Sequence, residues 1–294
     1  MLAPIVIFAF NRPDALLRLK NSLESNNLYA TSEKYVFVDG CRNDSDEPKV
    51  SEVIEIAHTI TDNVNVSPVN KGLATSVISG LSEMFKLYEK VIVLEDDLVC
   101  TPNFLDYMNQ MLEHYRQDAR IISICGYGLK IKKPRGYIGD IYLSCRSSSW
   151  GWGTWKNRWD NIDWQISDWQ EFSHDNRLKA EFNLGGSDMF SMLQGYMTGK
   201  NNSWAIRFCY NQFKQHKFSI CPFQSKVDNI GFGKDATNCD QKFSRFKTDM
   251  DINGSNRFIV PEKLEYNQCI ARQLKLYHSI PMRIYSKIRK ILNL

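Results

Sequence analysis

The sequence predicts an α/β fold, with a mostly parallel sheet that carries helices on both faces. Three observations predict it. Short apolar segments, rich in β-branched residues, alternate with helix-like segments through residues 1–125. These short segments are apolar at consecutive positions, which is typical of strands that are buried on both faces. Several of them end directly in charged or polar residues, as strands that open on a ligand site do.

The first predicted strand spans residues 4–10. A helix follows, because Pro13 suits a first helical turn and Leu16, Leu19 and Leu23 repeat at helical spacing. Further along the chain we expect strands at 35–38, 64–66, 90–94 and 121–125, and a helix at about 50–60. Another helix should start after Gly72 and turn inward Leu73, Val77, Leu81, Met84 and Tyr88.

The strand at 90–94 is followed at once by Glu95, Asp96 and Asp97. Three adjacent carboxylates repel one another unless a cation neutralises them, so the cluster predicts a divalent metal. Oxygen ligands favour Mg²⁺ or Mn²⁺ over Zn²⁺. On an extended strand, Glu95 and Asp97 would share a face and Asp96 would point to the other. An acidic turn without a ligand is the simpler interpretation.

Three other strands end near residues that suit a nucleotide. Arg12 could contact phosphate, and Asp39 could accept hydrogen bonds from a base or a ribose. Lys71 lies in a turn before a helix N-terminus, which attracts anions. Each residue alone is typical of a cap or a turn. Together they indicate a nucleotide site along one edge of the sheet.

Composition limits the classes of partner and compartment. The formal net charge of +4 is too small to indicate a protein that binds nucleic acid. The eight cysteines contain no C-x-x-C pair, and we expect reduced thiols in a cytoplasmic protein. Residues 4–10 are too few to span a bilayer and lack the features of a signal peptide.

The order and spacing of these motifs resemble nucleotide-sugar glycosyltransferases of the GT-A fold, and in particular the N-acetylglucosaminyltransferase I family and its bacterial relatives. The resemblance covers roughly residues 4–240 and rests on the segments 10–13, 38–40, 70–73, 93–97 and 102–104. It implies a Rossmann-like sheet with an elaborated, acceptor-side C-terminal half. Residues 1–125 would bind the donor, residues 126–260 would form the acceptor and catalytic half of the same domain, and residues 261–294 would form a helical tail.

The resemblance also implies roles for residues. Arg12 would contact the diphosphate, Asp39 the uracil ring, and Glu95 and Asp96 the ribose and sugar. Asp97 would be the ligand of Mn²⁺ or Mg²⁺. The implied reaction transfers N-acetylglucosamine or another hexose from a UDP-sugar to a hydroxyl of a glycan or a lipid-linked saccharide, with inversion at the anomeric carbon.

The acceptor side is predicted in the aromatic segment 147–155. Trp150 and Trp152 are either rings that stack on an acceptor sugar or anchors of the core, and the sequence favours neither. Further along, residues 227–238 resemble the loop that closes over the donor, in which Lys234 and Thr237 would reach phosphate. Asn238 stands where relatives often carry histidine.

One departure from the family falls on the expected general base. The segment 200–207 resembles the stretch in which an aspartate lies two positions before a tryptophan, but Asn202 occupies that position. An amide cannot accept the proton of the acceptor hydroxyl. Asp188 is the first substitute, and Asp163 and Asp228 are alternatives. Each could equally be a helix cap or a surface acid.

The segment 280–292 predicts an amphipathic helix with Ile284, Ile288 and Ile291 on one face and basic residues around it. Such a helix could lie on the anionic inner face of a membrane or dock on its own domain.

Two other functions remain open. The first is a nucleotidyltransferase. A phosphate loop rich in glycine and lysine after the first strand would favour it, but residues 10–13 are no such loop. The second is a non-catalytic carbohydrate-binding relative, which stays open because Asn202 replaces the expected base.

Overall fold

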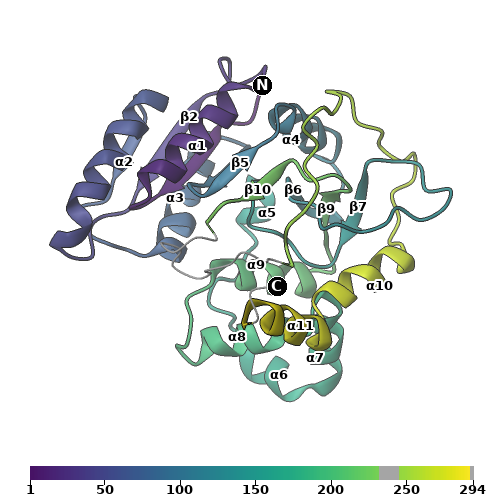
Figure 1. Ribbon diagram of the computed structural model, residues 1–294. Coiled ribbons are helices and arrows are strands. Elements are labelled where there is room, and N and C mark those ends of the chain that lie inside the picture. Colours follow the sequence, from purple (N-terminus) through teal and green to yellow (C-terminus); the bar gives the residue numbers. More distant parts are fainter. Residues whose placement is uncertain (232–244, 292–294) are drawn as a thin grey trace.

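The computed structural model of the chain describes residues 1–231 and 245–291 (Figure 1). Within these ranges an eight-stranded sheet runs through the molecule in the order β3-β2-β1-β4-β8-β6-β9-β7. Its strands are β1 (Ile5–Ala9), β2 (Lys34–Val38), β3 (Val64–Val66), β4 (Lys90–Glu95), β6 (Ile121–Cys125), β7 (Ile141–Ser144), β8 (Trp152–Trp155) and β9 (Phe218–Pro222).

The sheet is mostly parallel, as predicted. β3, β2, β1 and β4 are mutually parallel neighbours, and β6 is parallel to β9. β8 lies antiparallel between β4 and β6, so β6 runs in the same direction as β4. β7 pairs antiparallel with β9 and closes the order. The sheet is therefore continuous from the first half of the chain into the second.

Helices cover both faces of the sheet, and the alternation of side chains along β1 shows why. Ile5 and Ile7 join one buried cluster with α1 and α2, whereas Val6 and Phe8 join a second cluster with α3 and α9. The helices around the sheet are α1 (Pro13–Glu24), α2 (Glu47–Ile60), α3 (Leu73–Leu87), α4 (Phe104–His114) and α9 (Trp204–Lys214). The predicted strands and helices of the first half are confirmed in place and type.

The predicted inward face of α3 needs one correction. Val77, Leu81 and Met84 are buried, but Leu73 is 49% exposed because it is the first residue of the helix and faces solvent. Tyr88 follows the end of the helix and is half-buried, with its hydroxyl 2.6 Å from the hydroxyl of Tyr35.

A second, helical layer lies below the sheet in Figure 1. It contains α6 (Trp169–His174), α7 (Asn176–Phe182) and α8 (Met189–Met197), with a 3₁₀ turn at Asn183–Gly185. The short α5 (Lys156–Trp159) directly follows β8 instead, and a further 3₁₀ turn lies at Asp44–Asp46 before α2. α6, α7 and α8 pack with one side of α9 around Phe172 and Phe182. α9 joins this layer to the sheet, because its Trp204 and Phe208 pack in the cluster that contains Trp152 of β8.

The C-terminal segment forms α10 (Gln268–Tyr277) and α11 (Ile280–Ile291), which lie beside the helical layer (Figure 1). The helix predicted at 280–292 is confirmed as α11. Ile284 and Ile288 are exposed on it, and the side chain of Ile291 lies outside the described part. Every described helix is too short or too polar to span a bilayer.

Candidate functional site

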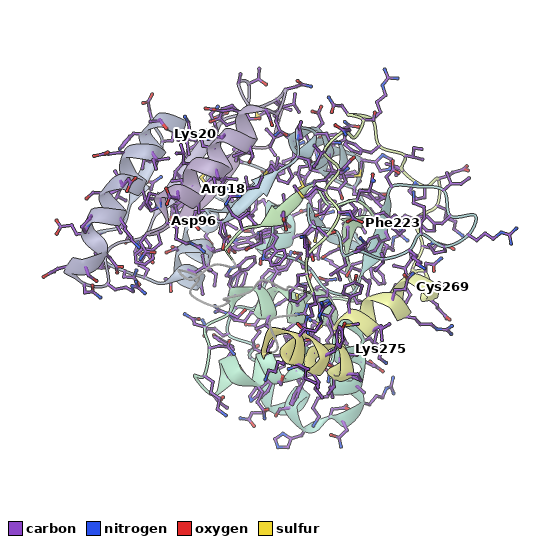
Figure 2. The ribbon with its side chains drawn as sticks, in the orientation of Figure 1. Arg18, Lys20, Asp96, Phe223, Cys269 and Lys275 are labelled. Carbon is purple, nitrogen blue, oxygen red and sulfur yellow. The ribbon has the colours of Figure 1, made fainter. Side chains whose placement is uncertain are left out.

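Four neighbouring parallel strands bring the predicted donor residues to one edge of the sheet. Arg12 follows β1, Asp39 follows β2, Lys71 follows β3, and Glu95 ends β4. Because β3, β2, β1 and β4 are parallel, their carboxyl ends lie at the same edge. In open α/β sheets this edge is where ligands bind. In Figure 2, Asp96 lies in this part of the molecule, close to α1.

Arg12 binds two of the three acids directly. Its Nη1 donates to Asp97 Oδ2 at 2.8 Å, and its Nη2 forms an ion pair with Asp96 Oδ1. The predicted alternation of Asp96 and Asp97 is wrong, because β4 ends at Glu95 and the next two residues form a turn into β5 (Leu98–Cys100). The turn directs both carboxylates at one guanidinium.

Backbone and amide donors fix this acidic turn further. The backbone N–H of Phe10 donates to Asp96 Oδ2 at 3.1 Å, and Asn229 Nδ2 donates to Asp97 Oδ1 at 3.2 Å. Asn229 belongs to β10 (Val227–Asn229), which pairs antiparallel with β5. The turn is therefore held from both halves of the chain. Among the described residues, no donor forms a hydrogen bond with the carboxyl of Glu95.

The charge of the turn is only partly compensated. Burial raises the pKa of Glu95 to about 8, and the neighbouring Asp97 and Asp96 add to the rise. Burial also raises the pKa of Asp96 to about 6, although Arg12 acts against it. Three carboxyl groups thus face one guanidinium. A further cation at this position would stabilise the charged form of the acids.

The donor set fits one type of metal site. No three His, Cys, Asp or Glu side chains within residues 1–231 and 245–291 are grouped to hold a metal by themselves. Mg²⁺ is usually bound by one or two carboxylates together with substrate phosphates, so a complete protein cage is not required. Glu95 and Asp97 supply carboxylate oxygens of that kind. The predicted contacts of Lys234, Thr237 and Asn238 lie outside the described residues.

Asp39 organises the turn that contains Lys71. Its carboxylate accepts the backbone N–H groups of Gly40 at 3.1 Å, Lys71 at 2.8 Å and Gly72 at 2.8 Å. Gly72 has a φ of 74°, which favours glycine, and it leads into α3. The Lys71 side chain is exposed. Asp39 therefore shapes the edge of the sheet, with Lys71 as an available cation beside it.

Two residues of this edge were not predicted. Asp46 is buried and accepts from Asn11 Nδ2 at 2.8 Å and from Arg42 Nε at 2.8 Å, which ties the loop after β2 to the loop after β1. Asn229 binds Asp97 across 132 positions. The Asn-Arg-Pro and Val-Asp-Asn segments were visible in the sequence, but no local pattern indicates partners so far apart.

The two candidate acceptor tryptophans have different environments. Trp152 is 1% exposed and stacks on Trp204 with ring centroids 5.0 Å apart. It is a core residue, so of the two alternatives for Trp152 the structure supports the core anchor and not the acceptor contact; β8 places its ring between the sheet and α9. Trp150 is half-buried and lines a pocket of about 310 Å³. Its ring lies 4.6 Å from that of Tyr127.

The residues considered for proton transfer are also separated by the structure. Asn202 is exposed, and its side-chain oxygen accepts from Arg207 Nη2 at 3.2 Å. Asp163 accepts backbone N–H groups from the loop that follows it, as a turn residue does. Asp188 is bound by Arg146, with Nη1 at 2.8 Å from Oδ1; although burial opposes it, Arg146 keeps the pKa of Asp188 lowered.

Asp228 has the environment best suited to a base. It lies on β10 next to Asn229, the residue that binds Asp97. Its carboxylate accepts from the backbone N–H of Asn229 at 3.0 Å, and burial raises its pKa above the ordinary value. A half-buried carboxylate with a raised pKa is a stronger base than one held by an arginine. Asp228 is thus next in sequence to a residue that binds the acidic turn, but its side chain points to the other face of β10, where it interacts with Lys247 and Tyr127.

Comparisons with known proteins give no family assignment. No protein-family model and no curated protein match the chain. Among solved structures, S. aureus TarS residues 1–349 align at 11% identity and a TM-score of 0.44, covering 79% of this chain and 61% of that one. The longer S. aureus TarS structure aligns at 11% and 0.47, covering 77% and 36%.

A third structure, the mannosyltransferase PcManGT from Pyrobaculum calidifontis in complex with GDP-Man and Mn²⁺, aligns at 10% identity and a TM-score of 0.35, covering 52% of this chain and 45% of that one. The chain thus spans less than two thirds of the length of each of these structures. Alignments of this quality do not establish an activity. The function therefore has to be argued from the site.

Proposed function

We propose that the chain is a GT-A-type glycosyltransferase that moves a hexose, such as N-acetylglucosamine, from a UDP-sugar to a hydroxyl group. The observation that carries this proposal is the meeting of Arg12, Asp39, Lys71 and the acidic turn at the carboxyl ends of four adjacent parallel strands. An edge with both acids and exposed cations suits a nucleotide diphosphate. The motif order in the sequence supports the same reading.

The proposed reaction is a single displacement. Asp228 accepts the proton of the acceptor hydroxyl, whose oxygen attacks the anomeric carbon while the bond to the diphosphate breaks and UDP leaves with the electron pair. A single displacement of this kind inverts the configuration at the anomeric carbon. Asp188 remains a second candidate for the base, but its ion pair with Arg146 makes it a weaker proton acceptor.

Asp97, with Glu95 beside it, is proposed to hold Mn²⁺ or Mg²⁺. The ion, when bound together with diphosphate oxygens, supplies positive charge to the leaving group. Asp96, which is 1% exposed and binds Arg12 and the backbone N–H of Phe10, is proposed to position Arg12. Arg12 and Lys71 are proposed to bind the phosphates. Asp39 is proposed to contact the base.

We propose that the acceptor is a glycan or a lipid-linked saccharide met at the inner face of a membrane. Ile280, Ile284 and Ile288 are exposed at intervals of four residues on α11. Arg283 and Lys287 lie between them, and the helix has no acidic residue. A basic helix with an exposed apolar stripe suits an anionic lipid surface. A cytoplasmic enzyme that is peripheral to the membrane fits this arrangement.

The first test is donor binding by calorimetry. UDP-N-acetylglucosamine and other UDP-hexoses are titrated with Mn²⁺ into the full chain and into Asp97→Ala. We expect the variant to bind the cognate donor at least tenfold more weakly with Mn²⁺ and to lose its Mn²⁺ dependence, because a charge-assisted ligand is removed. Asp175→Ala, which removes an acid at the N-terminus of α7, is the matched control. Equal donor affinity in Asp97→Ala and the parent chain would contradict the proposal.

The second test separates catalysis from binding. A transferase should release UDP slowly from its cognate donor in the presence of Mn²⁺, and Asp228→Asn should slow transfer to an acceptor by about a hundredfold or more while donor affinity stays within about twofold. Asp188→Asn run in parallel tests the other base. Donor binding without any UDP release would favour the non-catalytic carbohydrate-binding alternative, which the exposed amide of Asn202 keeps open.

A further inference from the structure

The pocket beside Trp150 has walls that are unusual for a saccharide site. Its volume is about 310 Å³, and it lies between the 142–150 segment, α8, α9 and α10. Apolar side chains from five separate elements or loops form much of its wall, namely Leu129, Leu184, Met192, Ile206 and Leu274. This volume is within the range of small-molecule sites.

The polar groups of the wall are largely occupied within the protein. A sugar ring is recognised by hydrogen-bonding groups that are free to face it, but five hydroxyls of this wall are already bonded to neighbouring residues. The hydroxyl of Ser144 donates to the Arg146 carbonyl at 2.7 Å, and that of Tyr127 donates to the Phe246 carbonyl at 2.6 Å. Ser148 Oγ accepts from the Trp150 N–H at 3.3 Å, and Ser203 Oγ accepts from the Ile206 N–H at 3.4 Å. The hydroxyls of Ser147 and Ser123 share a hydrogen bond of 3.1 Å.

The charged groups near the wall gather at its His278 end. Arg146 lines this end and pairs with Asp188 at 2.8 Å, and Arg245 and Arg283 lie close enough to act on His278. Burial together with the charge of Arg146 lowers the pKa of His278 to about 3, so its ring is neutral near pH 7. The aliphatic side chains form the rest of the wall. The wall suits an uncharged apolar group, because burying it removes apolar surface from water without leaving polar groups unpaired.

Gly151 follows the pocket residue Trp150 and packs against the core behind the acidic turn. This glycine has a φ of 57°, and a Cβ atom on it would lie 2.7 Å from Val227 Cγ1 and 3.4 Å from Leu94 Cδ2. Val227 and Leu94 directly precede Asp228 and Glu95 in the sequence. One end of the pocket, at Trp150, is therefore a single residue away from the packing that supports the proposed site.

The other end of the pocket leads to the C-terminal helices. Ala271 and Leu274 of α10 line it, and α11 follows within three residues of the end of α10. α11 carries the exposed stripe of Ile280, Ile284 and Ile288. The apolar pocket and this apolar surface are thus built by consecutive segments of the chain.

We propose that the pocket binds the hydrocarbon chain of an amphiphilic acceptor, with the hydroxyl-bearing head at the Trp150 end. The role of the head rests on the proposed transferase function, whereas the binding of the chain does not. The ligand class is defined by a linear apolar chain that is attached to a sugar or polyol head.

The test measures binding of alkyl β-glucosides with methyl, hexyl and octyl chains, each below its micelle-forming concentration, to the full chain by calorimetry. Burying one methylene contributes about 0.8 kcal/mol, so we expect affinity to rise roughly fourfold per methylene that enters the pocket. Binding that does not depend on chain length would overturn the proposal.

Two variants locate the binding. Ala271→Trp fills the pocket and should reduce octyl glucoside affinity to that of methyl glucoside. Arg272→Trp, on the exposed side of the same helix, is the control and should keep the parent affinity. Should Ala271→Trp fail to fold, Leu184→Asp places a charge in the wall at a position that is 48% exposed, and it should weaken octyl glucoside binding at least tenfold. Parent affinity in a folded Ala271→Trp or Leu184→Asp protein would overturn the proposal.

Donor titration of the same proteins separates the two proposals. Chain-length-dependent binding that Ala271→Trp removes, in a protein that binds no UDP-sugar, overturns the transferase and leaves the pocket assignment. Binding of a UDP-sugar, together with alkyl glucoside binding that does not depend on chain length, overturns the pocket assignment and leaves the transferase proposal. Vesicle-embedded and water-soluble alkyl acceptors, compared in transfer assays, then distinguish a membrane source from a free amphiphile.

Discussion

The acidic turn and the pocket both contain an arginine paired with aspartate, but they differ in the charge that remains. At the turn, Arg12 faces Asp96, Asp97 and the nearby Glu95. In the pocket wall, Arg146 faces Asp188. The turn therefore keeps negative charge that a cation can compensate, whereas the pocket wall keeps none, because Arg146, Arg245 and Arg283 lie near Asp188 and His278. Residual charge, rather than the presence of an ion pair, indicates which ligand each site suits.

The largest expected effect on stability comes from removing Arg12. Arg12→Gln leaves the buried Asp96 without its cation, and breaking such a pair costs about 3 kcal/mol of unfolding free energy. Urea unfolding at pH 7.5 measures the loss. Arg18→Gln, on the exposed side of α1 (Figure 2), is the control and should change stability by less than about 0.5 kcal/mol. Equal effects of the two variants would mean that the charges of the turn are already screened.

The second effect is a loss of stability as pH rises. The folded-state pKa of Glu95 is raised from 4.5 to about 8, and that of Asp96 from 3.8 to about 6. Between about pH 4 and pH 8 these two groups bind more protons in the folded chain than in the unfolded chain. Their contribution to folding stability is therefore fully present below pH 4 and is lost as pH rises towards 8. Each pKa unit corresponds to at most about 1.4 kcal/mol, and the partial exposure of Glu95 together with the coupling between the two acids reduces the loss.

Glu95→Gln should make folding stability depend less on pH between pH 6 and 8. Thermal unfolding without divalent metal measures this. Mn²⁺ should stabilise the parent chain more at pH 8 than at pH 5, because it binds the charged acids. Asp188 provides the opposite dependence: its lowered pKa contributes stability above its ordinary pKa that is lost only as pH falls below that value. A parent chain whose stability rises from pH 6 to 8 would refute the assignment to Glu95.

The smallest expected effect on stability comes from the ion pair between Arg146 and Asp188 in the pocket wall. Arg146→Gln leaves one unpaired carboxylate and should cost about 1.5 kcal/mol, and the additional change Asp188→Asn should recover most of it. The same pair of changes at the turn, Arg12→Gln with Asp96→Asn, should recover less, because Asp97 and Glu95 remain. Urea unfolding of the four single and two double variants gives both coupling energies. Equal recovery at the two sites would remove the distinction between them.

Local patterns predicted the first half of the fold well. Leu16, Leu19 and Leu23 repeat at helical spacing and are buried, and consecutive apolar residues marked β1 and β4 as strands covered on both faces. These patterns work because one helix face or one buried strand is determined by adjacent residues. They also placed Arg12 close to the acids, since parallel strands align their carboxyl ends.

Contacts across long sequence distances were beyond such patterns. The turn at Asp96 depends on Arg12 and Phe10, which come from another strand end, and this overrode the alternation expected of an extended strand. Trp152 was ambiguous in the sequence because glycine-spaced tryptophans occur both in cores and in sugar sites. Its burial follows from the position of β8 between β4 and β6, an antiparallel insertion that no spacing in the sequence indicates.

The insertion of β8 has a consequence for how the chain acquires its structure. Residues 152–155 supply the hydrogen-bonding partners of one side of β4, with Lys90 opposite Trp155 and Val93 opposite Trp152. A ribosome-bound chain that ends at residue 125 would expose that edge of β4 as an open ladder, which other strands can join. Residues 1–125 therefore need β8 to complete their sheet, and truncation before Trp152 should yield aggregates instead of a small folded fragment.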